Sequence, residues 1–281
     1  MVVLWQSDKL NLQIEIMKKT IIQGLFTIAL FFATWFVLTQ IDWVSVFRFQ
    51  KVTEKTEEKL GELFWEIFQK SEKENKNPFV VNSVDSIVTK ICSANKINRE
   101  FIKVHILDKE DINAFALPNG HLIVYSGLII NSDNQEELSG VISHEIAHIQ
   151  LNHVMRKLIK EFGLTVLISM TTGNGGSEII RETAKMLSSS AFDRSLEKEA
   201  DIKAVDYLIN ARVNPEPFAN FLYKLSDMEN ETTKYLTWIS THPDSKERAE
   251  YIIEYSTDKK TKYEAVMTID TWDKLKEKLQ E

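Results

Sequence analysis

The sequence predicts an α+β fold, in which a mostly helical domain with a small β-sheet is preceded by one transmembrane helix. Three observations lead to this prediction. An uncharged run of 18 residues, from Ile21 to Leu38, approaches the roughly 20 residues that cross a bilayer as a helix. Apolar side chains recur at helical spacing in most later segments. Short β-branched runs occur between residues 101 and 125.

The composition sets the broad class of the protein. The 281 residues, 43% of them hydrophobic, fit one medium-sized domain with attachments. The formal net charge of -7 provides no basic surface, so we expect no nucleic-acid partner. The single cysteine, Cys92, excludes an internal disulfide, and its place in an amphipathic segment predicts a buried core residue.

The apolar run predicts an uncleaved signal anchor over residues 20–40, because no small-residue cleavage site follows it. Residues 1–19 are then a cytoplasmic segment, of which residues 1–16 are a candidate upstream extension, since Met17 begins a bacterial secretory-type start. Two lysines after Met17 favour a cytoplasmic N-terminus, although basic residues also follow the span. We therefore expect a single-pass protein of the bacterial inner membrane with a periplasmic domain; a cytoplasmic domain is the alternative.

Residues 41–78 are expected to connect the anchor to the domain, and they include an amphipathic helix from Glu57 to Lys76. The domain itself is predicted to span residues 79–281. Its first elements are a helix at Val80–Ser93 and strands at Phe101–Leu107, Ile112–Leu117 and His121–Tyr125. The strand that starts at Ile112 is a candidate edge of the sheet.

A long helix follows the predicted strands. Asp133 and Glu136 form a capping box at its start, and the helix is expected to run to about Phe162. Near its middle it carries an HExxH pattern, His144-Glu145-Ile146-Ala147-His148. The residues around this pattern are apolar on nearly all sides, so the helix should be buried. Three polar side chains in a core need a partner, and a metal ion is the natural one.

The spacing of the HExxH pattern suits zinc. Residues four apart lie one above the other on a helix, so His144 and His148 can bind the same ion. Glu145, one residue further round, can hold a water molecule at the ion without binding the ion itself. A chance match is the alternative interpretation, and the remaining parts of a site must therefore be sought elsewhere in the chain.

Catalytic zinc usually has three protein ligands, and two candidates compete for the third position. His153 follows His148 by five residues, about 140° beyond a full turn, so it is expected to point away as a surface or capping histidine. Glu197 and Asp201 lie four residues apart on one face of a helix that Asp193 is expected to cap. In this arrangement Glu197 binds the metal, and Asp201 accepts the spare imidazole N–H of a ligating histidine.

A further segment runs from Ser240 to Arg248 and contains His242 followed by Pro243. Proline suits the first turn of a helix, so we expect His242 at the mouth of a helix and Arg248 within it. A His-Pro pair alone is a weak signal for a functional site. A last helix is expected at Thr271–Gln280.

These segments resemble, in the same order, the motifs of the HtpX, BepA and CAAX prenyl protease 1 family of gluzincin zinc peptidases. The resemblance covers roughly residues 80–255. It rests on Asn113–Pro118, Gly120–Leu128, the HExxH pattern, Glu197 with Ala200 and Asp201, and the segment from Ser240 to Arg248. The chain departs from several members of that family in having one predicted span and no long C-terminal repeat region.

The resemblance implies a zincin-type metallopeptidase domain with one Zn²⁺ per subunit. The implied roles are metal ligands His144, His148 and Glu197; catalytic residues Glu145 and His242; and supporting residues Asp201 and Arg248. An extended substrate would add to the sheet along the strand that contains Asn113, Ala114, Phe115 and Ala116.

The expected function is therefore that of a membrane-anchored zinc metalloendopeptidase. Its expected partners are the membrane and unfolded or extended polypeptides, whose removal would serve protein quality control in the cell envelope. Two alternatives are a zinc-bound chaperone or assembly factor with little proteolysis, and a specific processing protease. The sequence leaves the oligomeric state open.

Overall fold

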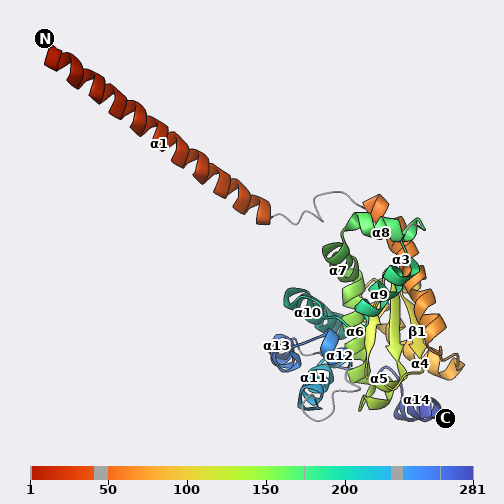
Figure 1. Ribbon diagram of the computed structural model, residues 1–281. Coiled ribbons are helices and arrows are strands. Elements are labelled where there is room, and N and C mark those ends of the chain that lie inside the picture. Colours follow the sequence, from red (N-terminus) through yellow and green to blue (C-terminus); the bar gives the residue numbers. More distant parts are fainter. Residues whose placement is uncertain (1, 41–49, 174, 229–236, 260, 281) are drawn as a thin grey trace. The chain divides into compact units, whose positions relative to one another are not determined.

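The computed structural model describes residues 2–40, 50–173, 175–228, 237–259 and 261–280, and it divides into two units, Met1–Lys51 and Val52–Glu281. Residues 41–49 of the predicted connector lie outside the described residues. The elements, drawn in Figure 1, are α1 (Val2–Gln40), α3 (Gln50–Ser71), α4 (Pro78–Ala94), the 3₁₀ turn η1 (Arg99–Phe101), β1 (Lys103–Leu107), β2 (Ala114–Ala116), β3 (His121–Tyr125), α5 (Ser126–Asn131), α6 (Gln135–Gln150), α7 (His153–Phe162), α8 (Leu164–Thr171), α9 (Ser177–Leu187), α10 (Arg194–Asn210), α11 (Glu216–Met228), α12 (Thr237–Thr241), α13 (Ser245–Thr257) and α14 (Ile269–Gln280). Helices around one small sheet confirm the predicted α+β class.

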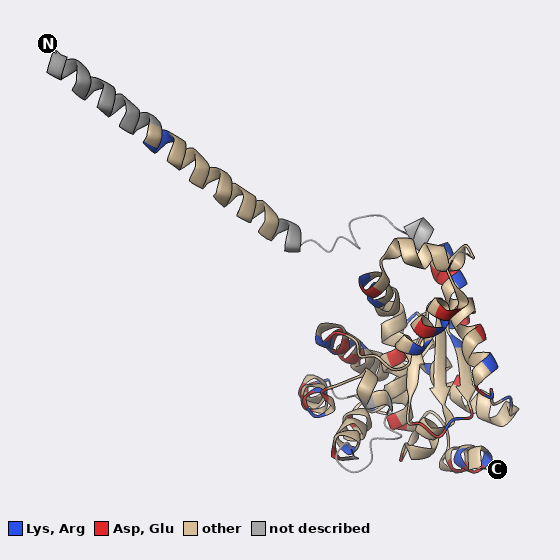
Figure 2. Ribbon diagram, in the orientation of Figure 1, with Lys and Arg blue, Asp and Glu red and all other residues tan. Residues whose placement is uncertain are grey.

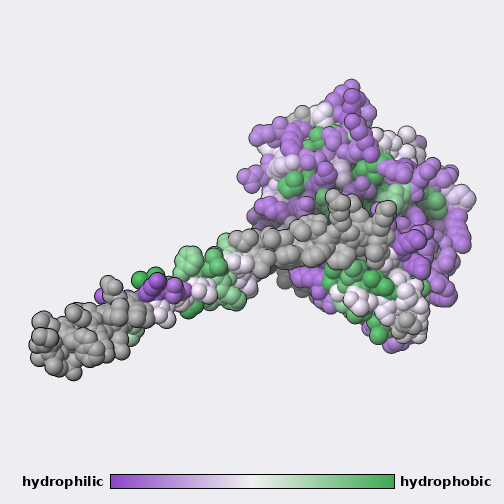
Figure 3. Space-filling model, turned by 90° about the horizontal axis from the view of Figure 1, so that it is seen from above, coloured by the Kyte–Doolittle hydropathy of each residue, from purple (hydrophilic) through white to green (hydrophobic). Residues whose placement is uncertain are grey.

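The first unit contains α1. Within the part of the chain that the structure describes, one stretch is long and apolar enough to cross a membrane: Met17–Phe36, with a mean hydropathy of 1.4. Its large apolar side chains are exposed, and Phe26 for example is 69% exposed. Figure 2 shows no charge on this stretch beyond its basic start, and Figure 3 shows its atoms largely white or green. Such a surface agrees with the predicted membrane anchor, because water solvates it poorly.

The sheet of the second unit has three strands in the order β1-β3-β2, with β1 parallel and β2 antiparallel to β3. β2 is therefore an edge strand, as the sequence predicts. The Asn113 carbonyl accepts from the Tyr125 N–H and the Leu117 N–H donates to the His121 carbonyl, and Phe115 lies at the matching position between them. In an antiparallel pair these alternate residues face the partner strand, so Ala114 and Ala116 turn their backbone N–H and C=O groups outward.

The central helix α6 packs against β2, α4, α10 and α11 (Figure 1). Each of its residues from Leu138 to Ile149 is buried, as the apolar pattern predicts. The start of the helix differs slightly from expectation. Asn134 accepts a hydrogen bond from the Glu137 N–H, while Glu137 accepts one from the Asp133 N–H. The reciprocal cap therefore forms one residue later than predicted, at Asn134 and Glu137.

The prediction that this helix continues to Phe162 is wrong. α6 ends at Gln150, and a separate helix, α7, begins at His153. Asn152 between them has a φ of 56°, a left-handed conformation that asparagine adopts more easily than most residues. The turn at Asn152 redirects the chain, so positions after it cannot be read from the helical spacing of α6.

Two further helices support α6 from the C-terminal half. α10 and α11 both pack on α6, and α13 packs on both of them. The approach of α11 to α6 depends on Gly140, where an added Cβ would lie 2.3 Å from the Cβ of Phe218. The predicted helix start at Pro243 is also wrong, because α13 begins at Ser245 after Asp244, whose φ is 62°. His242 consequently lies in the turn between α12 and α13.

Candidate metal centre and catalytic site

Four side chains from three parts of the chain converge in the core. His144 and His148 come from α6, Glu197 from the first turn of α10, and His242 from the turn before α13. One potential ligand atom of each residue lies within 4.8 Å of the other three, and all four residues are buried. The two Nε2 atoms of His144 and His148 are 2.9 Å apart, and Glu197 Oε1 lies 3.3 Å from His148 Nε2. We call these four residues the His-Glu cluster.

The chemistry of the His-Glu cluster fits zinc. Two imidazoles and a carboxylate are the three protein ligands of one class of catalytic zinc site. Burial lowers the pKa of His144 to about 3, so its ring is neutral near pH 7 and offers a lone pair to a metal. Burial alone would raise the pKa of Glu197, but His242 and Arg248 outweigh it and hold this pKa well below its usual range. The carboxylate is therefore ionised, as a metal ligand must be.

Glu145 lies beside the His-Glu cluster. Its Oε1 is 3.3 Å from His242 Nε2 and 3.4 Å from the indole Nε1 of Trp238. Its Oε2 is buried and makes no hydrogen bond to the described residues. Burial raises the pKa of Glu145 to about 7, and the backbone N–H of Ala116 on the edge strand faces this carboxyl. A pKa near 7 suits a group that both takes and returns a proton at neutral pH.

Asp201 and Arg248 form a buried ionic layer behind the His-Glu cluster. Asp201 Oδ1 lies 2.8 Å from His144 Nδ1, the ring nitrogen opposite the cluster. Arg248 donates from Nε and Nη2 to the two oxygens of Asp201, both at 2.7 Å, and its Nη1 lies 3.0 Å from Glu197 Oε2. Tyr251 also donates to Asp201. Arg248 thus joins the carboxylate that faces His144 to the carboxylate of the cluster.

The structure brings together all seven of the metal, catalytic and supporting residues that the sequence predicts: His144, Glu145, His148, Glu197, Asp201, His242 and Arg248. Tyr251 was not identified in the sequence. It follows Arg248 by three residues on α13, so the helical spacing from Arg248 is the signal that points to it.

The expectation that His153 is a surface or capping residue is wrong. The side chain is fully buried, and its Nδ1 lies 3.0 Å from the Nδ1 of His148. Its Nε2 lies 3.2 Å from Glu199 Oε2 on α10. The expectation assumed that one unbroken helix carries His148 and His153. The left-handed turn at Asn152 breaks the helix and places the His153 side chain against the ring of His148. It is not among the four residues whose ligand atoms converge.

Aromatic side chains cover the site. The ring of Phe192 stacks on His148 with 4.2 Å between centroids, and that of Trp238 stacks on His242 at 4.6 Å. Lys157 donates to the Ser190 carbonyl, and its Nζ lies 4.3 Å from the centre of the Phe192 ring. His144, Glu145 and His148 have no exposed surface. These three side chains are therefore out of contact with solvent, whereas Glu197 and Arg248 line a cavity of about 240 Å³.

The predicted substrate-binding strand runs next to the site. Asn113 donates from Nδ2 to the Ser188 carbonyl at 3.3 Å. The ring of Phe115 contacts Phe68 and Tyr125, with centroids 5.1 and 5.7 Å away, which places this side chain in the core. The backbone N–H and C=O groups of Ala114 and Ala116 are not used in pairing with β3, and both residues are buried.

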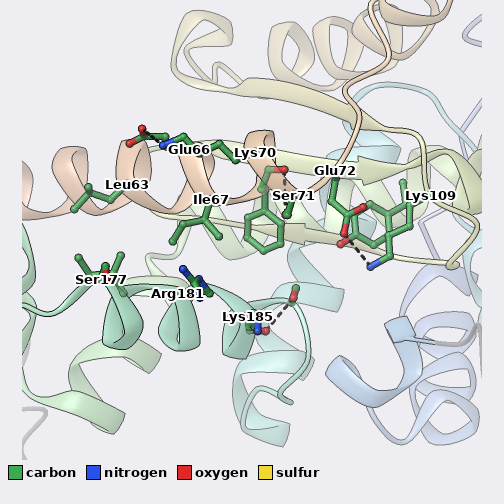
Figure 4. Close-up of a pocket in the computed structure, with 14 residues that line it drawn as sticks. Leu63, Glu66, Ile67, Lys70, Ser71, Glu72, Lys109, Ser177, Arg181 and Lys185 are labelled. Carbon is green, nitrogen blue, oxygen red and sulfur yellow. Dashed lines mark hydrogen bonds and ion pairs between the residues drawn. The ribbon is translucent and has the colours of Figure 1, made fainter.

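A cavity of about 590 Å³ lies beside β2, between α3 and α9 (Figure 4). Its lining includes Phe68 and Tyr125, whose rings contact Phe115 of β2, and Ser188, which accepts a hydrogen bond from Asn113. The lining combines acidic, basic and apolar side chains, and the residues labelled in Figure 4 are Leu63, Glu66, Ile67, Lys70, Ser71, Glu72, Lys109, Ser177, Arg181 and Lys185. Its lining, within the described residues, includes no member of the His-Glu cluster.

Comparison with known proteins matches residues 80–256 to peptidase family M48. This range contains every residue of the His-Glu cluster, Glu145 and the supporting Asp201 and Arg248. It covers more than half of the chain and leaves α1 outside the match.

Several curated proteins are similar to the same part of the chain. A beta-barrel assembly-enhancing protease from Yersinia pestis is 27% identical over 165 residues, which is 54% of this chain and 34% of that protein. The mitochondrial metalloendopeptidase OMA1 from Bos taurus is 31% identical over 163 residues, 53% of this chain and 31% of that protein. Metalloprotease LoiP from Escherichia coli is 30% identical over 165 residues, 56% of this chain and 64% of that protein. The chain spans about a third of the length of the first two relatives and less than two thirds of the third.

Proposed function

Because this chain belongs to peptidase family M48, we propose that it is a membrane-anchored zinc metalloendopeptidase that cuts extended segments of unfolded polypeptides. One observation carries the proposal: two histidines and a carboxylate converge beside a buried glutamate whose Oε2 makes no hydrogen bond to the described residues. That constellation is the minimum that metal-assisted hydrolysis needs, namely three ligands and a base placed next to them.

The residues of the site have separate tasks in the reaction. His144, His148 and Glu197 would hold zinc, which when bound supplies a Lewis acid that polarises the scissile carbonyl and makes water more acidic. Glu145 takes a proton from the attacking water as the oxygen bonds to the carbonyl carbon. It then gives this proton to the amide nitrogen as the C–N bond breaks.

His242 has a second role in this proposal. Its Nδ1 lies 3.0 Å from Glu197 in the His-Glu cluster, and its Nε2 faces Glu145. We propose that, in the absence of substrate, His242 would be the fourth ligand beside His144, His148 and Glu197. When a substrate enters, an N–H of the same ring is placed to donate a hydrogen bond to the oxygen that gains negative charge.

The edge strand supports the choice of an extended substrate. The N–H and C=O groups of Ala114 and Ala116 face away from β3 and can pair with one further strand once the Ala116 N–H is released from Glu145. A polypeptide has to be extended to form these hydrogen bonds, so unfolded segments are preferred over folded ones. The packing around His148, where the ring of Phe192 stacks on its imidazole, must open first, because His148 has no exposed surface.

The proposed location is the bacterial inner membrane, with the domain on the periplasmic side. The exposed apolar stretch Met17–Phe36 and the lysines at its start support an anchor with a cytoplasmic N-terminus. The relative from Yersinia pestis is named for the assembly of β-barrels, and we extend from it a role in envelope protein quality control. The test is a fusion, after Glu281, of a reporter enzyme that works only in the cytoplasm. Activity of this reporter would contradict the proposed orientation.

The reaction is tested with the full chain in detergent and unfolded casein as substrate. Glu145→Gln should retain zinc and lose at least about 100-fold in cleavage rate, because the base is absent. Glu136→Gln, on the same helix but outside the site, is the matched control and should cleave like the wild type. Equal cleavage by Glu145→Gln and the wild type would exclude the mechanism. Casein binding without cleavage by the zinc-loaded wild type would instead favour the chaperone alternative.

A further inference from the structure

The two histidines of the HExxH pattern have different partners on the ring nitrogens that face away from the His-Glu cluster. His144 Nδ1 lies 2.8 Å from the carboxylate of Asp201. His148 Nδ1 lies 3.0 Å from another histidine nitrogen, His153 Nδ1. The second arrangement needs explanation, because a histidine ring presents either a donor or an acceptor at each nitrogen.

Metal binding fixes which nitrogen carries the proton. When His148 binds an ion through Nε2, its proton resides on Nδ1, so His148 donates to His153. His153 must then accept on Nδ1 and carry its own proton on Nε2. That proton points to Glu199 Oε2, 3.2 Å away, which can only accept. One pattern of hydrogen bonds therefore runs from the cluster through His153 to Glu199.

We propose that His153 and Glu199 are positioning residues that hold the ring of His148 in the orientation and the tautomer, with the proton on Nδ1, in which it binds zinc. This inference rests on the proposed function only in taking the His-Glu cluster as a zinc site. Partners of this kind raise the basicity of a ligating imidazole and restrict its rotation, and their loss typically weakens metal binding about 10- to 100-fold.

The surroundings of the two residues differ in a way that is useful for a test. His153 is fully buried at the start of α7, where the left-handed turn at Asn152 places it. The side chain of Glu199 is 50% exposed, and Arg156 Nη1 lies 3.7 Å from its Oε2. Substitution of Glu199 therefore perturbs packing very little, whereas substitution of His153 also changes the core.

His153 does not act as an additional ligand in this arrangement. Its Nδ1 faces His148 Nδ1, which is the side of the His148 ring opposite the cluster, and its Nε2 faces Glu199. Both nitrogens are thus engaged away from the four converging atoms. The expected effect of substitution is weaker binding of one zinc ion and an unchanged number of zinc ions per chain.

The test measures the zinc dissociation constant of the full chain in detergent by competition with a chromophoric chelator. His153→Phe, which retains an aromatic ring but no acceptor, should bind zinc about 10- to 100-fold more weakly. Glu199→Ala should weaken binding by a smaller factor. Glu199→Gln keeps an acceptor oxygen and should restore most of the wild-type affinity. Glu250→Ala, an exposed glutamate on α13, is the matched control and should bind zinc like the wild type.

Unfolding of the metal-free proteins by urea separates positioning from packing. A purely structural role would lower the stability of the metal-free variants and leave the zinc affinity of the folded proteins unchanged, which would overturn the proposal. If His153→Phe does not fold, wild-type zinc affinity in Glu199→Ala overturns the proposal equally. Neither readout depends on peptide cleavage, so a failure of the proposed reaction in Glu145→Gln remains a separate result.

Discussion

Replacement of Arg248 by methionine should destabilise the protein strongly, because Asp201 loses its main ionic partner and Glu197 loses one of its two. Arg248 is 2% exposed and makes two hydrogen bonds of 2.7 Å to Asp201. It also lies 3.0 Å from Glu197 and donates to the His242 carbonyl at 3.1 Å. Removing one partner of a buried ion pair costs about 3–5 kcal/mol, a large part of the total stability of a typical domain.

Protonation of Asp201 limits the loss of stability that Arg248→Met can cause. Burial favours the neutral form of this carboxyl, and Arg248 together with His144 outweighs burial and holds its pKa well below the usual range. Without Arg248 the pKa of Asp201 rises, and uptake of a proton relieves part of the penalty. The destabilisation should therefore be largest at high pH, where this protonation is least favourable.

Urea unfolding of the full chain in detergent measures the effect, once with EDTA and once with zinc to separate the contribution of the metal. Arg248→Met should lower the free energy of unfolding by about 3–5 kcal/mol in EDTA. Arg248→Lys keeps the charge but loses the parallel pair of hydrogen bonds, and a loss of about 1–3 kcal/mol is expected. A loss below about 1 kcal/mol in Arg248→Met would refute the ionic layer as a major source of stability.

Three further predictions concern packing, pH and the metal. Gly140→Ala places a Cβ 2.3 Å from Phe218, and this overlap should lower the free energy of unfolding by about 1–3 kcal/mol, although alanine has the better helix propensity. Gly176→Ala is the control and should change the free energy of unfolding little, because its Cβ would meet open space. Burial, followed by the charge of Lys103, lowers the pKa of His121 to about 4. As the pH falls, the unfolded chain therefore takes up a proton at this histidine before the folded chain does, and the free energy of unfolding should fall by up to about 3 kcal/mol between pH 6.5 and pH 4. Urea titrations should show a smaller fall in His121→Gln. EDTA should abolish casein cleavage and lower the melting temperature, and equimolar zinc should restore both; cleavage that persists after chelation would contradict a metal-dependent reaction.

The local pattern of the sequence was sufficient to predict most of the site. The i, i+4 spacing places His144 and His148 on one face of α6, and the same spacing places Glu197 and Asp201 on one face of α10. That these two helices meet follows from their apolar faces, and small residues such as Ala200 allow the close approach. The edge position of the strand around Phe115 was also predicted, and the strand order β1-β3-β2 confirms it.

The turns and the cover of the site were not predictable in the same way. Asn152 leaves the helix in a left-handed conformation, and the helical pattern on either side of it is continuous enough to hide the break. The position of His153 depends on this single backbone angle. Phe192 and Trp238 belong to no motif, and their contacts with His148 and His242 arise from the packing of distant segments.

The burial of the site lowers the apparent affinity that the proposed peptidase can have for a polypeptide. His144, Glu145 and His148 have no exposed surface, and the ring of Phe192 lies against His148, so a substrate of the proposed reaction reaches Glu145 only in molecules whose packing around the site has changed. The apparent dissociation constant is then the intrinsic constant divided by the open fraction, and an open population of about 1% weakens binding about 100-fold. In the proposed reaction, a change that loosens this packing would therefore raise turnover without any change at His144, His148 or Glu197.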